Sequence, residues 1–194
     1  LKKFNIRFHL FSYLKYNKEL SNLILRISAP LIGQFSISLI SWLVFYIFIE
    51  HHGERALAIS NVMRNIFSLV GVFIWAFAST TNAMVSNIIG QGRTSEVQRL
   101  IYKIMKLSLS SAVIMFILFN VFAGELLSVF RLSDSFITEA IPVLRIVTTG
   151  MLLMSISVVW LNAVTGTGNT RMNLIIEAVT ITLYLIYIYL VLEV

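Results

Sequence analysis

The side chain with the clearest capacity for chemistry is Glu177, the one carboxylate within the apolar run 172–192. A carboxylate in hydrocarbon is costly and usually faces a bundle interior or water. Such a group can carry a proton or coordinate a cation. Because Glu177 lies little more than one helical turn from the end of its run, its side chain could also reach back to water. An ion-coupling role for Glu177 is therefore one of two open interpretations.

Other polar and aromatic residues recur in four apolar runs when each run is stepped at about 100° per residue. They are Gln34, Ser38, Ser41 and Phe45 in the first run, Asn61, Asn65, Ser68, Trp75, Ser79, Asn82 and Ser86 in the second, Thr148, Ser155 and Asn162 in the fourth, and Asn173, Glu177, Thr180, Tyr184 and Tyr187 in the fifth. Stripes of this kind either hydrogen-bond neighbouring helices or line a cavity. We expect these four helices to share a polar interior, and the third, more uniformly apolar helix to lie outside, facing lipid.

Other motifs carry less. His51 and His52 are adjacent, so on a helix they diverge by about 100° and cannot easily bind one metal. The sequence Gly166-Thr167-Gly168 joins two apolar runs rather than a strand and a helix, which argues against a phosphate loop. The chain has no cysteine, which excludes disulfides and thiolate metal sites. We therefore expect no enzyme, no metal site and no cofactor.

The elements that must position these residues are membrane-spanning helices. Hydrophobic residues make up 58% of the 194 residues and charged residues 12%. A soluble domain of this size still exposes roughly a third of its surface to water, so it could not bury this much apolar surface. Five runs are long enough to cross about 30 Å of hydrocarbon: 31–49, 66–89, 107–123, 146–165 and 172–192. The sequence thus predicts an all-α membrane protein with five transmembrane helices.

The net charge of +6 comes mostly from one side of these helices. Eleven of the 15 Lys and Arg residues precede the first run or lie in the second–third and fourth–fifth connections. The positive-inside rule places this side and the N-terminus in the cytoplasm. Because this rule accounts for the basic charge, we expect no nucleic-acid partner. Residues 1–29 are expected to form a cytoplasmic linker, with an extended segment over 3–10 and an interfacial helix leading into Pro30; residues 30–194 form the transmembrane lobe.

Two junctions carry a family resemblance. Residues 85–93 read VSNIIGQGR after the second run, and residues 161–171 read LNAVTGTGNTR between the fourth and fifth runs. Together with Pro30 and Gly33-Gln34, this order resembles multidrug and toxic compound extrusion (MATE) transporters, which have two six-helix halves around a central cleft. The resemblance implies five helices of the C-terminal half, with the N-terminal half and a final helix as missing partners. Ser38 stands near the position where some sodium-coupled members have a glutamate, so coupling would rest on Glu177 or on the absent half.

The resemblance implies a secondary active antiporter of the bacterial inner membrane, which expels organic cations or amphipathic drugs in exchange for protons or sodium. Phe45, Trp75, Tyr184 and Tyr187 would offer aromatic faces to a cationic substrate in the cleft. The polar cleft candidates are Gln34, Ser38, Asn61, Asn65, Asn82 and Asn162. Two alternatives stay open: a lipid-linked oligosaccharide flippase of the same superfamily, which would use Arg64 and Arg145, and a structural fragment without transport of its own.

Overall fold

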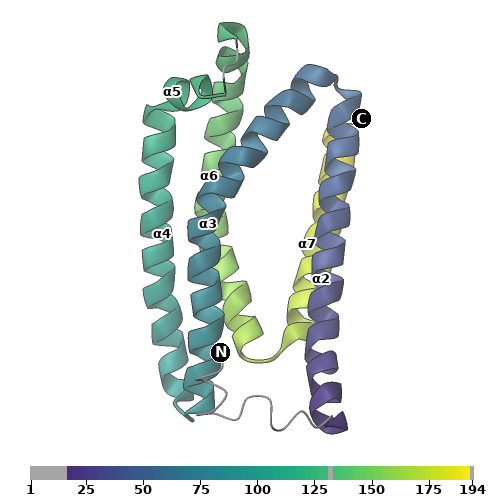
Figure 1. The fold of residues 1–194 in the computed structure, drawn as a ribbon, viewed down its shortest axis with the longest axis vertical. Helices are drawn as coiled ribbons and strands as arrows, with labels where there is room; N and C mark the ends of the chain where they lie inside the picture. Colours follow the sequence, from purple (N-terminus) through teal and green to yellow (C-terminus); the bar gives the residue numbers. More distant parts are fainter. Residues whose placement is uncertain (1–16, 131–132, 193–194) are drawn as a thin grey trace, which may run out of the picture.

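The computed structural model describes residues 17–130 and 133–192, and over these residues the chain is helical (Figure 1). The long helices are α2 (Lys18–His51), α3 (Glu54–Gly90), α4 (Val97–Val121), α6 (Asp134–Gly166) and α7 (Thr170–Leu192), and the short ones are η1 (Thr94–Glu96) and α5 (Ala123–Ser128). Five helices are long and apolar enough to cross a membrane, and no strand lies in the described ranges. The predicted all-α architecture with five spans is confirmed. The extended segment expected over 3–10 lies outside the described residues.

The first helix differs from the prediction at Pro30. The sequence suggested that an interfacial helix would end there, but α2 continues without a break from Lys18 to His51. Proline cannot donate the backbone hydrogen bond of its turn, yet helices in membranes tolerate it because neighbouring groups satisfy the freed carbonyl. Asn17 caps the start of α2, since its side chain accepts a hydrogen bond from the backbone N–H of Leu20 at 3.1 Å. The helix expected before Pro30 is thus the first part of α2, while the division into a linker and a transmembrane lobe at this point stays a prediction.

The glycine-containing junctions both form tight turns. Gly92 follows α3 with φ +74°, and Gly168 lies between α6 and α7 with φ +81°. These backbone conformations are strained for residues with a side chain. The two motifs noted in the sequence thus mark the points where the chain reverses between consecutive helices.

The long helices form two groups. α2 packs mainly along α7, whereas α3, α4 and α6 pack closely on one another. Figure 1 shows α2 and α7 side by side, with α3 leaning away from them toward α4 and α6. Most of the buried side chains belong to the second group, including Ile66, Ile74, Leu144 and Met151.

The packing of α4 corrects the prediction of a polar interior shared by the other four helices. Ser108 Oγ on α4 donates to the Ser155 carbonyl on α6 at 3.0 Å. Asn120 Nδ2 on α4 donates to Thr148 Oγ1 on α6 at 3.0 Å. The Thr148 hydroxyl and the Ser155 backbone carbonyl thus join α6 to α4, while the Ser155 hydroxyl donates to the Leu152 carbonyl of its own helix. Both side chains are buried, so neither lines a cleft shared with α2 and α7. Stepping around a helix shows which residues share a face but not which neighbour that face meets, and this is why the prediction is wrong here.

Candidate functional site

Ser38 and Glu177, two of the predicted site residues, contact each other. Ser38 Oγ on α2 donates a hydrogen bond to Glu177 Oε1 on α7 at 2.5 Å, and the pair is partly buried. The helices approach closely nearby, where a Cβ added to Gly33 would lie 3.6 Å from Leu174 Cδ1. The packing of α2 on α7 therefore brings together two residues that are 139 positions apart in sequence. Both were predicted as site residues, but their contact was not.

This contact places two oxygen ligands beside each other among apolar helices. A carboxylate and a hydroxyl are the hard donors that small cations prefer. The same carboxylate can instead take up a proton, after which it becomes a hydrogen-bond donor. The hydroxyl can follow this change, because it can both donate and accept. The pair can therefore hold either a proton or a cation.

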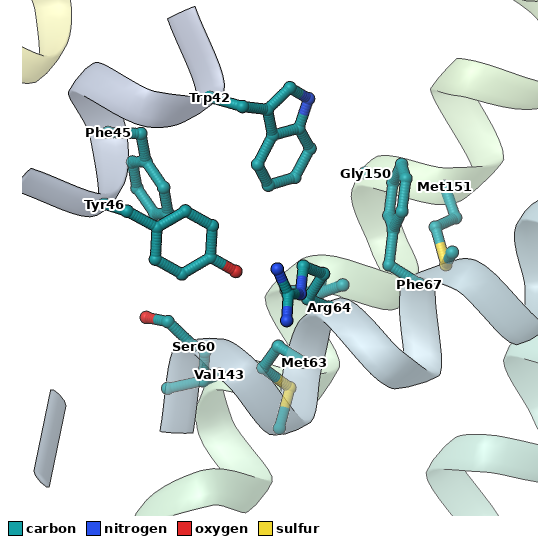
Figure 2. Close-up of a pocket in the computed structure, with 11 residues that line it drawn as sticks. Trp42, Phe45, Tyr46, Ser60, Met63, Arg64, Phe67, Val143, Gly150 and Met151 are labelled. Atoms are coloured by element: carbon teal, nitrogen blue, oxygen red, sulfur yellow. The ribbon is translucent and has the colours of Figure 1, made fainter. Parts of the chain in front are cut away.

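A cavity of about 390 Å³ lies between α2, α3 and α6 (Figure 2). On α2, Trp42, Phe45 and Tyr46 follow the i, i+3, i+4 spacing that places side chains on one helical face. The α3 wall has the same kind of spacing. The lining residues are Trp42, Phe45, Tyr46, Ser60, Met63, Arg64, Phe67, Val143, Val147, Gly150 and Met151.

The aromatic rings of this cavity contact one another. The Trp42 ring centre lies 6.0 Å from that of Phe67 on α3 and 6.2 Å from that of Tyr46, with which it is stacked. Phe45 meets Tyr46 edge-on at 5.6 Å. Aromatic pairs at these separations add to the stability gained by burying their surface. The rings therefore form a continuous wall that also connects α2 to α3.

Arg64 brings a positive charge to this wall. Its Cζ atom lies 5.5 Å from the centre of the Tyr46 ring, within the range of a cation–π contact. The Tyr46 hydroxyl is buried and has no hydrogen-bond partner among the described residues. Figure 2 shows this hydroxyl and the Arg64 guanidinium directed toward the same space. The cavity thus combines an apolar aromatic wall with two donor groups, the Tyr46 hydroxyl and the Arg64 guanidinium, that have no hydrogen-bond acceptor among the described residues.

The other residues proposed for the cleft do not line this cavity. On α3, Asn65 and Trp75 lie on the exposed face, while Asn61 and Asn82 are partly buried. The remaining candidates lie on three other helices: Gln34 is partly buried on α2, Asn162 donates to the Val158 carbonyl within α6, and Tyr184 and Tyr187 are exposed on α7. Their role in a cleft stays a prediction.

Sequence reasoning missed Trp42, Tyr46 and Phe67. The i, i+3, i+4 spacing of the α2 aromatics was the available signal, but the predicted polar stripe of the first apolar run includes only Phe45 of these. Arg64 had been considered only for the flippase alternative. His51 and His52 are exposed at the end of α2, and residues 17–130 and 133–192 contain no cluster of three or more His, Asp or Glu side chains that could hold a metal.

The fold and these two sites define a polytopic helical membrane protein, with an acid between two helices and an aromatic cavity beside them. Comparison with known families gives a more specific result. The family model MatE matches residues 30–190, and the chain belongs to this family of multidrug and toxic compound extrusion transporters. Members of the family are transporters rather than enzymes. No curated protein and no solved structure gave a significant match.

Proposed function

We propose that the chain is the C-terminal half of a secondary active efflux antiporter of the bacterial inner membrane, with the N-terminus on the cytoplasmic side. It expels organic cations or amphipathic drugs in exchange for protons or sodium. The observation that supports this function best is the hydrogen bond between Ser38 and Glu177. An acid that is partly buried between two spans is the kind of group that can couple ion binding to movement.

The mechanism follows from the position of the pair. Glu177 accepts a hydrogen bond from Ser38 when it is ionised, and this bond joins α2 to α7. When Glu177 takes up a proton or a sodium ion, this hydrogen bond is replaced by contacts of the Glu177 and Ser38 oxygen atoms with the proton or the ion. Alternating access in such transporters is largely a rigid-body movement of one half or bundle against the other. Ion exchange at Glu177 would therefore change how the α2–α7 pair sits within its half.

Transport in proteoliposomes that contain the full-length antiporter tests the coupling role. Glu177→Gln removes the titratable group but keeps a similar shape, and Ser38→Ala removes only the hydroxyl. Glu125→Gln on α5 is the matched control, because Glu125 is exposed and lies far from Ser38 and Glu177 in the sequence. We expect Glu177→Gln to abolish the dependence of efflux on pH or sodium, while Glu125→Gln leaves it unchanged. Unchanged efflux and unchanged ion dependence in Glu177→Gln would refute the coupling role.

One observation favours the flippase alternative: a cation, Arg64, lines the aromatic cavity between α2, α3 and α6. A lipid-linked pyrophosphate carries more than one negative charge, however, and Arg145 does not line this cavity. A single arginine neutralises such a group only in part. If the unaltered protein transports no lipid-linked oligosaccharide, the flippase function is excluded. Transport that persists in Arg64→Gln and Arg145→Gln together would exclude a role for these two arginines.

A further inference from the structure

We propose that the cavity between α2, α3 and α6 binds molecules with an aromatic body and one anionic group, and that Arg64 and the Tyr46 hydroxyl hold this group. Of the two substrate classes given above, organic cations and amphipathic drugs, the proposal assigns to this cavity only amphipathic molecules, and among them the acidic ones. That the bound molecules are transported rests on the proposed function, whereas their binding does not.

The charge of the cavity is the first support. Arg64 is exposed and makes no ion pair within the described part of the chain. Two other arginines do form ion pairs: Arg55 contacts Glu139 at 2.6 Å, and Arg93 contacts Glu96 at 2.6 Å. No Asp or Glu is among the described residues that line the cavity. An organic cation would therefore meet a positive charge with nothing to offset it, whereas an anion would neutralise it.

The unsatisfied hydroxyl is the second support. A buried polar group without a partner is unfavourable, and nearly all such groups in proteins have one. Tyr46 Oη can donate its proton to an oxygen atom of a ligand. Since the guanidinium next to it has five donors and no acceptor, the ligand group that satisfies both residues must be an acceptor. A sulfonate or carboxylate meets this requirement.

The walls define the rest of the ligand. Trp42, Phe45 and Phe67 offer ring surfaces, and Met63 and Met151 offer polarisable side chains that adapt to irregular shapes. Drug-sized molecules occupy mostly apolar pockets of about 300–1,000 Å³ with a few polar groups that fix their orientation. A volume of about 390 Å³ fits a fused two-ring system with one charged substituent.

Isothermal titration calorimetry with the protein in lipid nanodiscs tests the proposal. The probes are naphthalene-2-sulfonate and a naphthyl trimethylammonium ion, which share a ring system and differ in the sign of the charge. Geranyl diphosphate serves as the third probe, since it represents a lipid-linked anionic group. The variants are Arg64→Gln and Tyr46→Phe. Arg55→Gln is the matched control, because it removes an arginine charge from the same helix without altering the cavity lining.

The expected result is tighter binding of the sulfonate than of the ammonium ion. Loss of a hydrogen bond to a charged group corresponds to about tenfold in affinity. We therefore expect Arg64→Gln to weaken sulfonate binding about tenfold or more, Tyr46→Phe to weaken it several-fold, and Arg55→Gln to leave it unchanged.

Three outcomes would overturn the proposal. They are tighter binding of the ammonium ion, sulfonate binding that is insensitive to both Arg64→Gln and Tyr46→Phe, and tighter Arg64-dependent binding of geranyl diphosphate, which would replace the aromatic ligand with a lipid one. Calorimetry needs no ion gradient, so failure here is distinguishable from failure of the Glu177 coupling role.

Discussion

The close approach of α6 to α3 at Gly166 leads to a quantitative prediction. A Cβ added to Gly166 would lie 2.8 Å from the Asn82 carbonyl oxygen and 2.9 Å from Val85 Cβ. Ordinary contacts of a Cβ begin at 3.4 Å, so the shortest contact is 0.6 Å too close. The obstructing oxygen belongs to the backbone of α3 and cannot rotate away. Gly166→Ala must therefore push the end of α6 away from α3.

The energetic cost follows from this geometry. Inserting a methyl group into a well-packed site typically costs about 1–3 kcal/mol. Alanine also favours a helix over glycine by up to about 1 kcal/mol, which partly hides the clash. Gly150→Ala on the same helix is the matched control, because a Cβ there has no neighbour within 4 Å. We expect Gly166→Ala to be less stable than Gly150→Ala by about 1–3 kcal/mol.

The assay is reversible unfolding in mixed micelles, in which the free energy of unfolding of each variant is measured against the same wild type. Because both variants replace glycine by alanine on the same helix, the difference in helix propensity between the two residue types largely cancels. Equal stability of Gly166→Ala and Gly150→Ala would refute the reasoning, because it would show that α6 can move away from α3 at no cost.

Three further predictions follow from other contacts. Ser38→Ala should alter the ion dependence of efflux in the same direction as Glu177→Gln but less strongly, as measured in proteoliposomes, because the carboxylate remains. Asn173 is 1% exposed and donates to Thr165 and to a carbonyl of α6, so Asn173→Leu should lower the free energy of unfolding by about 1–3 kcal/mol. The hydrogen bond from Arg93 lowers the pKa of Glu96; the ion pair is thus fully present above the usual carboxyl pKa and is lost as the pH falls through the lowered one. A carbon-13 NMR titration of Glu96 should show this lowered pKa, and Arg93→Gln should raise it.

Much of the fold could be predicted because lipid constrains the sequence strongly. A helix that crosses hydrocarbon must be long and apolar, so the five runs could be predicted from the distribution of apolar residues along the sequence. The turns at Gly92 and Gly168 were visible as well, because glycine adopts the positive φ that they require. The continuity of α2 through Pro30 was not visible, since proline ends helices in water but not always in membranes.

The candidate site was predictable only residue by residue. Glu177 stood out because a carboxylate is rare in an apolar run, and Ser38 stood out by position. Their contact depends on the pairing of α2 with α7, which the periodicity of either helix does not encode. The same limit explains Thr148 and Ser155, whose face was identified correctly while the helix that it meets was not.

The two proposed sites meet on α2, so in the proposed mechanism this helix would link ion exchange to ligand binding. Ser38 and Trp42 are four residues apart, about one turn of helix, so the ion-binding contact and the aromatic wall lie on neighbouring parts of one element. In α2 and α7 only 6% of the most apolar stretch is buried, against 33% in α3 and α6. The α2–α7 pair thus buries less of its apolar surface within the described chain than α3 and α6 do. A change at Glu177 that shifts α2 would also move Trp42 and Tyr46 relative to Arg64, and ion exchange would thereby reshape the cavity that holds the ligand.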